Sequence, residues 1–194
     1  MTAPDRFTQE SLDWNPWLEP MAIEELTERH YEGLVQKPRA KNPYFRLLAD
    51  EPDVLGARTR ADLEIFYNTA DGLPRAEREL AATAVSRVNG CIYCASVHSA
   101  FTSHFSKRTD DVQRLLDEGV TAELGEEWDA VVAASAALAA TPPTFGPEHV
   151  VRLREAGFDD VAILDVVNAG AFFSWANRLM LSLGEPDLPE TERP

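Results

Sequence analysis

Across most of this 194-residue chain, apolar residues recur at helical spacing, in stretches separated by Gly and Pro. In a helix, residues three and four positions apart share a face, whereas a strand alternates its faces at every residue. Regular helices commonly end at Gly or before Pro, so the breaks mark the ends of elements. The sequence therefore predicts an all-α protein made of several helices.

The expected helices follow these breaks along the chain. Asp71-Gly72 and Asn89-Gly90 each end one helix, and Pro142-Pro143 ends an Ala-rich one. The predicted helices cover residues 21–36, a short segment beginning at Pro43, and residues 53–70, 74–88, 91–106, 109–118, 126–140, 147–156 and 159–183.

The length and the 44% hydrophobic content are sufficient for one compact domain with an ordinary core. We expect this all-α domain to cover residues 21–184. Residues 1–20 contain two Trp and three Pro, so we expect an irregular arm that docks on a neighbouring surface. Residues 185–194 are acidic and rich in Pro, which predicts a loosely held tail.

The charge balance limits the possible partners, because 33 Asp and Glu oppose 18 Lys and Arg and give a formal net charge of -15. Nucleic acids and anionic membranes bind basic patches, so the charge argues against both. The first residues lack the apolar segment of a signal peptide, and the longest apolar run, residues 130–140, is too short to cross a bilayer. We therefore expect a cytoplasmic protein.

The two cysteines stand close together, as Cys91-Ile92-Tyr93-Cys94. Two cysteines are too few for a disulfide scaffold, and this spacing cannot cross-link distant parts of the chain. In a reducing cytosol such a pair is typical of a catalytic or redox dithiol. A pair of buried structural thiols and a zinc site with His98 as third ligand are the alternatives, although no second Cys pair is present for zinc.

A histidine follows the cysteines at a spacing that suits thiol chemistry. If Cys91 opens a helix, about 100° per residue places Cys91, Cys94 and His98 within about 60° of one another on one face. The partial positive charge of the helix N-terminus favours a thiolate at Cys91, and an imidazolium favours one at Cys94. Glu79, on the preceding helix, would orient His98 or relay a proton if the two helices pack as an antiparallel pair, although the charged run 77–79 is also typical of a solvent-facing surface.

The spacing Glu-x11-Cys-x2-Cys-x3-His over residues 79–98 resembles the signature of the alkylhydroperoxidase D and carboxymuconolactone decarboxylase superfamily. The resemblance is strongest over residues 73–106, and residues 172–184 resemble the closing helix of peroxidase-related members. It implies an alkylhydroperoxidase D-like helical bundle that assembles into a homo-oligomer (dimer, trimer or hexamer). It also implies that neither a metal nor a haem cofactor is used.

The resemblance further assigns roles to the motif residues. Cys94 would attack a hydroperoxide, Cys91 would resolve the resulting sulfenic acid as a disulfide, and Glu79 and His98 would assist. A dithiol or thioredoxin-like partner would reduce the disulfide. Following this pattern, we expect Cys94 to have the lower thiol pKa. Tyr93 departs from the pattern, because the characterised alkylhydroperoxidase has His before its second Cys, so a proton relay through that position is altered.

These features predict a thiol-dependent peroxidase. One alternative is a non-enzymatic redox sensor or scaffold that retains the dithiol. Another is a carboxymuconolactone decarboxylase-like enzyme acting on a small organic acid or lactone, although decarboxylases of the superfamily generally lack the Cys pair.

Several side chains outside the motif are expected to have structural roles. His104 lies about 80° round the helix from Cys94, which favours a surface or subunit contact. Tyr93 is expected to pack or to form a wall of the pocket. Core or interface positions are predicted for the aromatic residues Phe172, Phe173 and Trp175, and an ion pair or interface contact, rather than an anion site, for Asn177 and Arg178.

Overall fold

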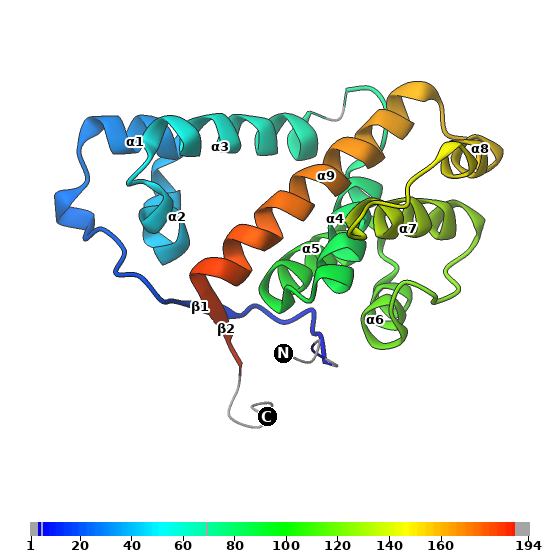
Figure 1. The fold of residues 1–194 in the computed structure, drawn as a ribbon, viewed down its shortest axis with the longest axis horizontal. Coiled ribbons are helices and arrows are strands. Elements are labelled where there is room, and N and C mark those ends of the chain that lie inside the picture. The colour runs from blue at the N-terminus through cyan, green and yellow to red at the C-terminus, as the bar shows by residue number, and fades with distance from the viewer. Residues whose placement is uncertain (1–3, 5, 69, 189–194) are drawn as a thin grey trace.

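The computed structural model describes residues 4, 6–68 and 70–188, and these residues are predominantly helical, which confirms the predicted fold class (Figure 1). Two short 3-10 helices, η1 and η2, and a two-stranded sheet accompany the α-helices. In chain order the described elements are β1 (Asp13–Pro16), η1 (Ile23–Glu25), α1 (Glu28–Leu34), η2 (Lys37–Lys41), α2 (Pro43–Leu48), α3 (Pro52–Tyr67), α4 (Arg75–Asn89), α5 (Ile92–Ser106), α6 (Thr109–Glu118), α7 (Glu126–Ala139), α8 (Pro147–Glu155), α9 (Asp160–Leu183) and β2 (Gly184–Asp187).

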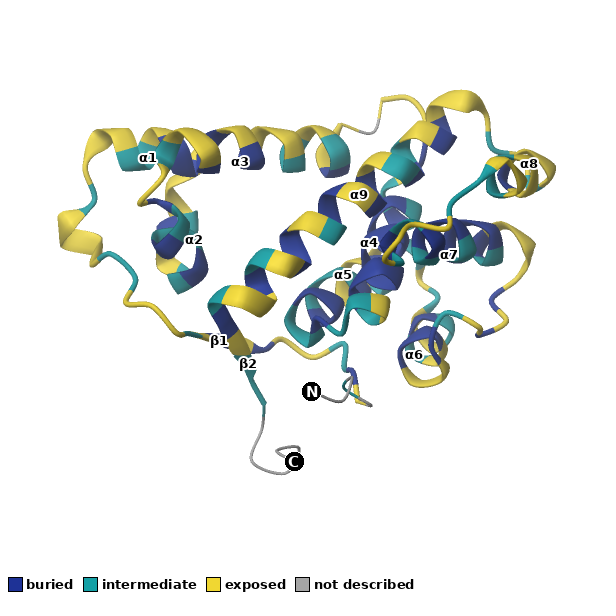
Figure 2. Cartoon of the chain, viewed as in Figure 1, coloured by how far each residue is buried: buried dark blue, intermediate teal, exposed yellow. Residues whose placement is uncertain are grey.

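The main hydrophobic core lies where α4 packs against α5, α7 and α9. Small side chains allow this close packing, because Ala81, Ala82 and Ala84 of α4 are fully buried. Figure 2 shows α4 and α7 as almost continuously buried, in contrast to the helices at the molecule's edges. This packing gives a rigid support for the side chains of α4 and α5.

The turn between α4 and α5 sets the position of the cysteines. Gly90 caps α4 with φ 74°, a left-handed conformation that a residue with a Cβ rarely adopts. The backbone N–H of Cys91 then donates to the carbonyl of Ser86 (3.0 Å), and Cys91 becomes the N-cap of α5. The chain therefore reverses within two residues, as Asn89-Gly90 predicts.

The N-terminal part has its own smaller hydrophobic cluster, formed by Leu34, Ala40, Ala49 and Leu55. The helix predicted over residues 21–36 is wrong in its extent, because the chain forms η1 and then α1, with Thr27 as N-cap between them. The backbone N–H of Thr27 donates to Nδ1 of His30 (3.0 Å), so the local side chains stabilise a helix start there.

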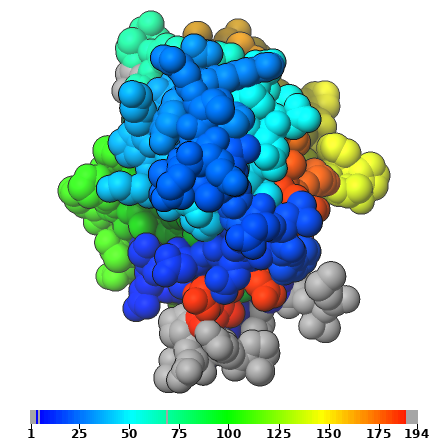
Figure 3. Space-filling model, turned by 90° about the vertical axis from the view of Figure 1, so that its left-hand side faces the viewer, coloured from blue at the N-terminus to red at the C-terminus, as the bar shows by residue number. Residues whose placement is uncertain are grey.

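The described parts of the two terminal regions form a small sheet that the sequence does not predict. In the region expected to be an irregular arm, β1 pairs antiparallel with β2, which falls largely within the expected tail. Trp14 is buried by this pairing and packs edge-on against Tyr44, with ring centroids 5.5 Å apart. Figure 3 shows the N-terminal segment, in blue, passing over the C-terminal strand, in red. The two segments supply each other's backbone partners; residues 189–194 of the tail lie outside the described residues.

Within the described ranges, every helix is too short or too polar to cross a membrane.

Candidate active site

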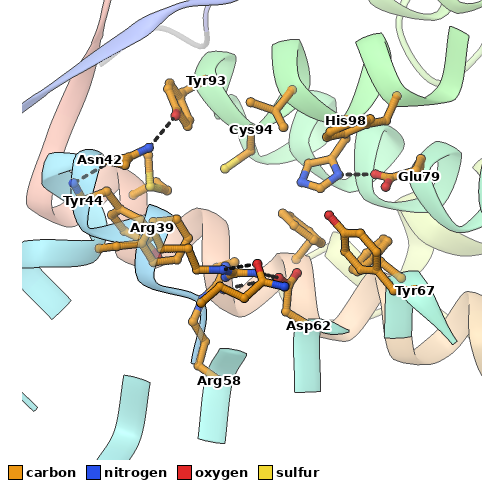
Figure 4. A pocket seen from close by; sticks show the side chains of 18 of the residues that line it. Arg39, Asn42, Tyr44, Arg58, Asp62, Tyr67, Glu79, Tyr93, Cys94 and His98 are labelled. Carbon is orange, nitrogen blue, oxygen red and sulfur yellow. Dashed lines mark hydrogen bonds and ion pairs between the residues drawn. The ribbon is translucent and has the colours of Figure 1, made fainter. Parts of the chain in front are cut away.

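A cavity of about 350 Å³ lies between the α4–α5 hairpin with α9 on one side and η2, α2 and α3 on the other. Cys94, His98 and Glu79 line it, whereas Cys91 is not among the lining residues. Figure 4 shows Cys94 and His98 on one side of this space, with Arg39, Arg58 and Asp62 on the opposite side. We call the first group, with Arg75 and Glu79, the reactive wall; the binding wall consists of Arg39, Tyr44, Arg58 and Asp62.

Glu79 is the buried hub of the reactive wall, with 1% of its surface exposed. One carboxylate oxygen accepts a hydrogen bond from Arg75 Nε (2.6 Å) and forms an ion pair with Nη2 (2.5 Å), and the other lies 2.5 Å from Nδ1 of His98. The interpretation of residues 77–79 as a solvent-facing charged surface is therefore wrong for Glu79. Because a buried carboxylate is stable only when it is paired, Arg75 is a necessary part of this arrangement.

His98 is fixed from both sides. With Glu79 as a carboxylate acceptor, Nδ1 carries the proton and donates it, which leaves Nε2 available as a base. The ring packs against Phe173 and Phe66, with centroid separations of 4.0 and 5.6 Å. Cys94 precedes His98 by four residues on α5, and residues at this spacing are neighbours on a helix surface. The geometry is that of a thiol with an oriented imidazole beside it.

The two cysteines form no disulfide, and the pKa values of their thiols are shifted in opposite directions. The pKa of Cys91 is lowered, chiefly because the Cys94 thiol donates a hydrogen bond to it, against the opposing effect of burial. The pKa of Cys94 is raised well above its usual value, because its proton is held by Cys91 and because it is buried. The expectation that Cys94 has the lower pKa is therefore wrong. The order of the pKa values has a structural reason. The N-terminus of α5 favours a thiolate at Cys91, and Nδ1 of His98 is bound to Glu79 and not to a thiol.

Asn177 of α9 is a site residue that the sequence analysis misassigned. Its side chain is fully buried, accepts a hydrogen bond from Asn89 (3.0 Å) and donates one to Ser86 Oγ (3.1 Å). Hydrogen bonding from Asn177 also acts to lower the pKa of both cysteines. Because Asn177 lies 83 residues beyond Cys94 in the sequence, local spacing gives no signal for it.

The polar groups of the binding wall are less completely hydrogen-bonded than those of the reactive wall. Arg39 Nη2 lies 3.2 Å from Asp62 Oδ2, and Arg58 Nη1 lies 3.7 Å from the same oxygen, which is too far for a hydrogen bond. Among the described side chains, Arg58 Nε, Arg58 Nη1 and the Tyr44 hydroxyl are buried without a hydrogen-bond partner. Burial raises the pKa of Tyr44 to about 12, and the charge of Arg58 partly opposes this.

Tyr93 forms part of the cavity lining and connects the two sides. Its hydroxyl accepts a hydrogen bond from Asn42 Nδ2 (3.1 Å), and Asn42 also caps α2 by accepting from the Tyr44 backbone N–H (2.9 Å). Burial raises the pKa of Tyr93, so its proton is retained at neutral pH. Tyr93 therefore links α5 to the start of α2 through a hydrogen bond.

The remaining predicted residues have the following places. His104 is exposed and lies outside the cavity lining, and Phe172 and Phe173 are buried, whereas Trp175 is 40% exposed. Arg178 donates to the Ser174 carbonyl and the Thr141 hydroxyl and makes no ion pair with any residue that the structure describes. The zinc alternative needs three converging ligands, and the described part of the chain contains no such group of His, Cys, Asp or Glu.

Comparison with known proteins places this site in context. Residues 52–142 match the model of the carboxymuconolactone decarboxylase family. Among curated proteins, none matches the sequence.

Three solved structures are similar in fold. A peroxidase-related protein from Ralstonia eutropha JMP134, described as an alkylhydroperoxidase AhpD core, has 21% identity and a TM-score of 0.74 over 87% of this chain and 90% of its own. A peroxidase-related protein from Silicibacter sp. TM1040 has 24% identity and a TM-score of 0.68, covering 96% of this chain and 95% of its own. The debrominase Bmp8 has 18% identity and a TM-score of 0.69, covering 87% and 90%.

Proposed function

The chain belongs to the alkylhydroperoxidase D and carboxymuconolactone decarboxylase superfamily, and we propose that it is a thiol-dependent peroxidase that reduces organic hydroperoxides. The observation that carries the proposal is the division of the dithiol: Cys94 opens onto a cavity shared with His98, whereas Cys91 lies outside the cavity lining. A substrate in the cavity meets only one of the two sulfurs. Cys94 is thus the attacking thiol, and Cys91 is the resolving thiol.

In the resting site the Cys94 thiol donates its hydrogen bond to Cys91. In the first step the thiol turns to His98 and gives its proton to Nε2, and the Cys94 sulfur attacks the terminal oxygen of the hydroperoxide. The O–O bond breaks, and the leaving alkoxide takes the proton back from the imidazolium. The products are an alcohol and a sulfenic acid on Cys94. Glu79 stabilises the transient imidazolium through its contact with Nδ1, and the ion pair with Arg75 holds Glu79 in place.

In the second step, the Cys91 thiolate attacks the Cys94 sulfur. A Cys91–Cys94 disulfide forms, and the hydroxide that leaves is protonated to water. The place of Cys91 at the N-terminus of α5 suits this step, because the partial positive charge there favours the thiolate, which is the reactive form. An external dithiol, or a thioredoxin-like protein, then returns the pair to the reduced state, and no metal or organic cofactor takes part.

Two alternatives use the same residues differently. A redox sensor or scaffold would be oxidised once per event and would need no room for an organic substrate. A cavity of about 350 Å³ beside Cys94 supports an enzyme instead. An enzyme acting on a small organic acid or lactone would use His98 and the cavity but not the dithiol.

We also propose that the protein is a cytoplasmic homo-oligomer (dimer, trimer or hexamer) and binds neither nucleic acid nor membrane. The support is the apolar surface of α9, where Val161, Leu164 and Trp175 are 50%, 60% and 40% exposed. Light scattering at micromolar concentration tests this assembly. A monomer alone would contradict it.

The function itself is tested by peroxide consumption with dithiothreitol as reductant. We expect multiple turnovers in the wild type, none in Cys94→Ser, and a single oxidation in Cys91→Ser, where a dimedone probe traps the sulfenic acid on Cys94. A wild type that oxidises once and then stops would indicate a sensor. Trapping in Cys94→Ser instead of Cys91→Ser would reverse the two roles.

A further inference from the structure

The feature that the peroxidase mechanism does not use is Arg58. Its side chain is 7% exposed, it lines the cavity, and its Nε and Nη1 atoms have no hydrogen-bond partner among the described residues. A buried guanidinium with unused donors costs free energy unless a ligand completes its hydrogen bonds. An anionic oxygen that enters the cavity completes such a donor with a charge-assisted hydrogen bond, and a carboxylate is an anion that an organic substrate commonly carries.

The charge of the cavity also favours an anionic ligand. Its lining includes three arginines (Arg39, Arg58 and Arg75) against Asp62 and Glu79, which leaves one net positive charge when His98 is neutral. The chain as a whole has a formal charge of -15, so this cavity is an exception within an acidic protein. Asp62 is shared between Arg39 and Arg58, and Glu79 is already bound to Arg75 and His98, so the excess charge lies at the binding wall.

The rest of the cavity is suited to an apolar body. Arg58 lies over the rings of Phe45 and Phe172, at 5.4 and 5.2 Å from their centroids, which holds the guanidinium in place. Phe66, Phe173 and Met180 add apolar side chains to the lining of the same cavity. The charge of Arg58 also acts to lower the pKa of Cys94, so the two groups are close enough to contact one small molecule.

We propose that Arg58 forms an anion subsite, and that the substrate is an organic hydroperoxide bearing a carboxylate at the end opposite its peroxide group. The apolar part of this molecule lies against the aromatic lining. The carboxylate binds Arg58, and the peroxide reaches Cys94. This inference rests on the proposed function for the reacting group, whereas the carboxylate subsite is tested independently of it.

The test uses two matched pairs of small molecules. Calorimetry compares the binding of para-isopropylbenzoate with that of para-isopropylbenzamide, which has the same shape and no charge. Turnover assays compare cumene hydroperoxide with its para-carboxy derivative. In the wild type we expect the carboxylate to bind about 10-fold to 100-fold more tightly than the amide, as is typical of a charge-assisted contact. The carboxylated hydroperoxide is expected to have the lower KM.

Arg58→Met removes the charge while keeping an extended apolar side chain, and Asp62 retains Arg39 as its partner. We expect this variant to bind para-isopropylbenzoate no more tightly than para-isopropylbenzamide, and calorimetry measures this loss of preference without reference to turnover. Arg58→Lys, which keeps the charge, is expected to retain part of the preference and serves as the second variant if Arg58→Met does not fold.

The possible outcomes separate the two proposals. Equal binding of the acid and the amide to the wild type would overturn the subsite without any variant. A preference that persists in Arg58→Met would also overturn it. Tight carboxylate binding without turnover of either hydroperoxide would refute the peroxidase and leave the anion subsite standing.

Discussion

The two walls of the cavity differ in how completely their polar groups are satisfied. On the reactive wall, Glu79 is bound by both Arg75 and His98, and α4 and α5 are part of the main core. On the binding wall, Arg58 and Tyr44 keep unpaired polar atoms. The neighbouring N-terminal helices contribute to a separate and smaller hydrophobic cluster. The comparison indicates that the groups required for proton transfer are fixed in advance, while those facing a substrate remain free to bind it.

The sharpest test of this division is kinetic. His98→Gln removes the base beside Cys94, so we expect kcat for hydroperoxide reduction to fall by about 10²-fold to 10⁴-fold with little change in KM. Arg58→Met is the matched variant on the opposite wall and is expected to raise KM for a carboxylated substrate by a larger factor than it lowers kcat. If His98→Gln changed only KM, the two walls would not differ in this way.

A second test concerns the support beneath each wall. Leu80 of α4 and Leu55 of α3 are both almost fully buried, in the main and the smaller cluster respectively. We expect Leu80→Ala to lower the free energy of unfolding by about 4 kcal/mol and Leu55→Ala by about 2 kcal/mol, because the smaller cluster at the edge of the molecule can collapse into the space. Urea unfolding measures both values. Equal losses would show that the binding wall is as rigidly supported as the reactive wall.

The same contrast explains what the sequence can predict. The helical hairpin and the group Glu79, Cys94 and His98 follow from local spacing, because residues a few turns apart on packed helices must meet. The family match over residues 52–142 includes this group and α3, yet leaves out α2 and α9. The positions of the binding wall and of Asn177 depend on tertiary packing between distant segments, so no short sequence motif predicts them. The pairing of β1 with β2 escaped prediction for the same reason.

The thiol pKa order is a further case in which local reasoning was not enough. The spacing of His98 from Cys94 suggested that the imidazole would lower the pKa of that thiol, but in the resting site the Cys94 proton is held by Cys91. The outcome depends on the orientation of side chains from two helices.

A third test uses pH on the binding wall. Since the pKa of Tyr44 is raised from 10.0 to about 12, the fold favours its neutral form. This contribution is fully present below pH 10 and is lost as the pH rises from 10 towards 12. In urea unfolding, the free energy of unfolding of the wild type is expected to fall between pH 9 and pH 11. We expect the fall in Tyr44→Phe to be smaller by about 1.3 kcal/mol, because this variant has no phenol at position 44. Tyr67→Phe, at an exposed position, is the control and should behave as the wild type does. Parallel losses in Tyr44→Phe and the wild type would contradict the prediction.

The smallest expected effect concerns the hydrogen bond between Tyr93 and Asn42, which links α5 to α2. Tyr93→Phe removes the hydroxyl that accepts from Asn42, and we expect a loss of about 1 kcal/mol in unfolding free energy. Asn42→Asp keeps the oxygen that caps α2 but lacks the donor, so the double variant should cost less than the sum of the two single ones. Because the proposed proton path runs from Cys94 through His98 and not through Tyr93, kcat should be almost unchanged in Tyr93→Phe. A tenfold fall in kcat at constant KM would instead place Tyr93 in the proton path, as a replacement for the histidine that the alkylhydroperoxidase has there.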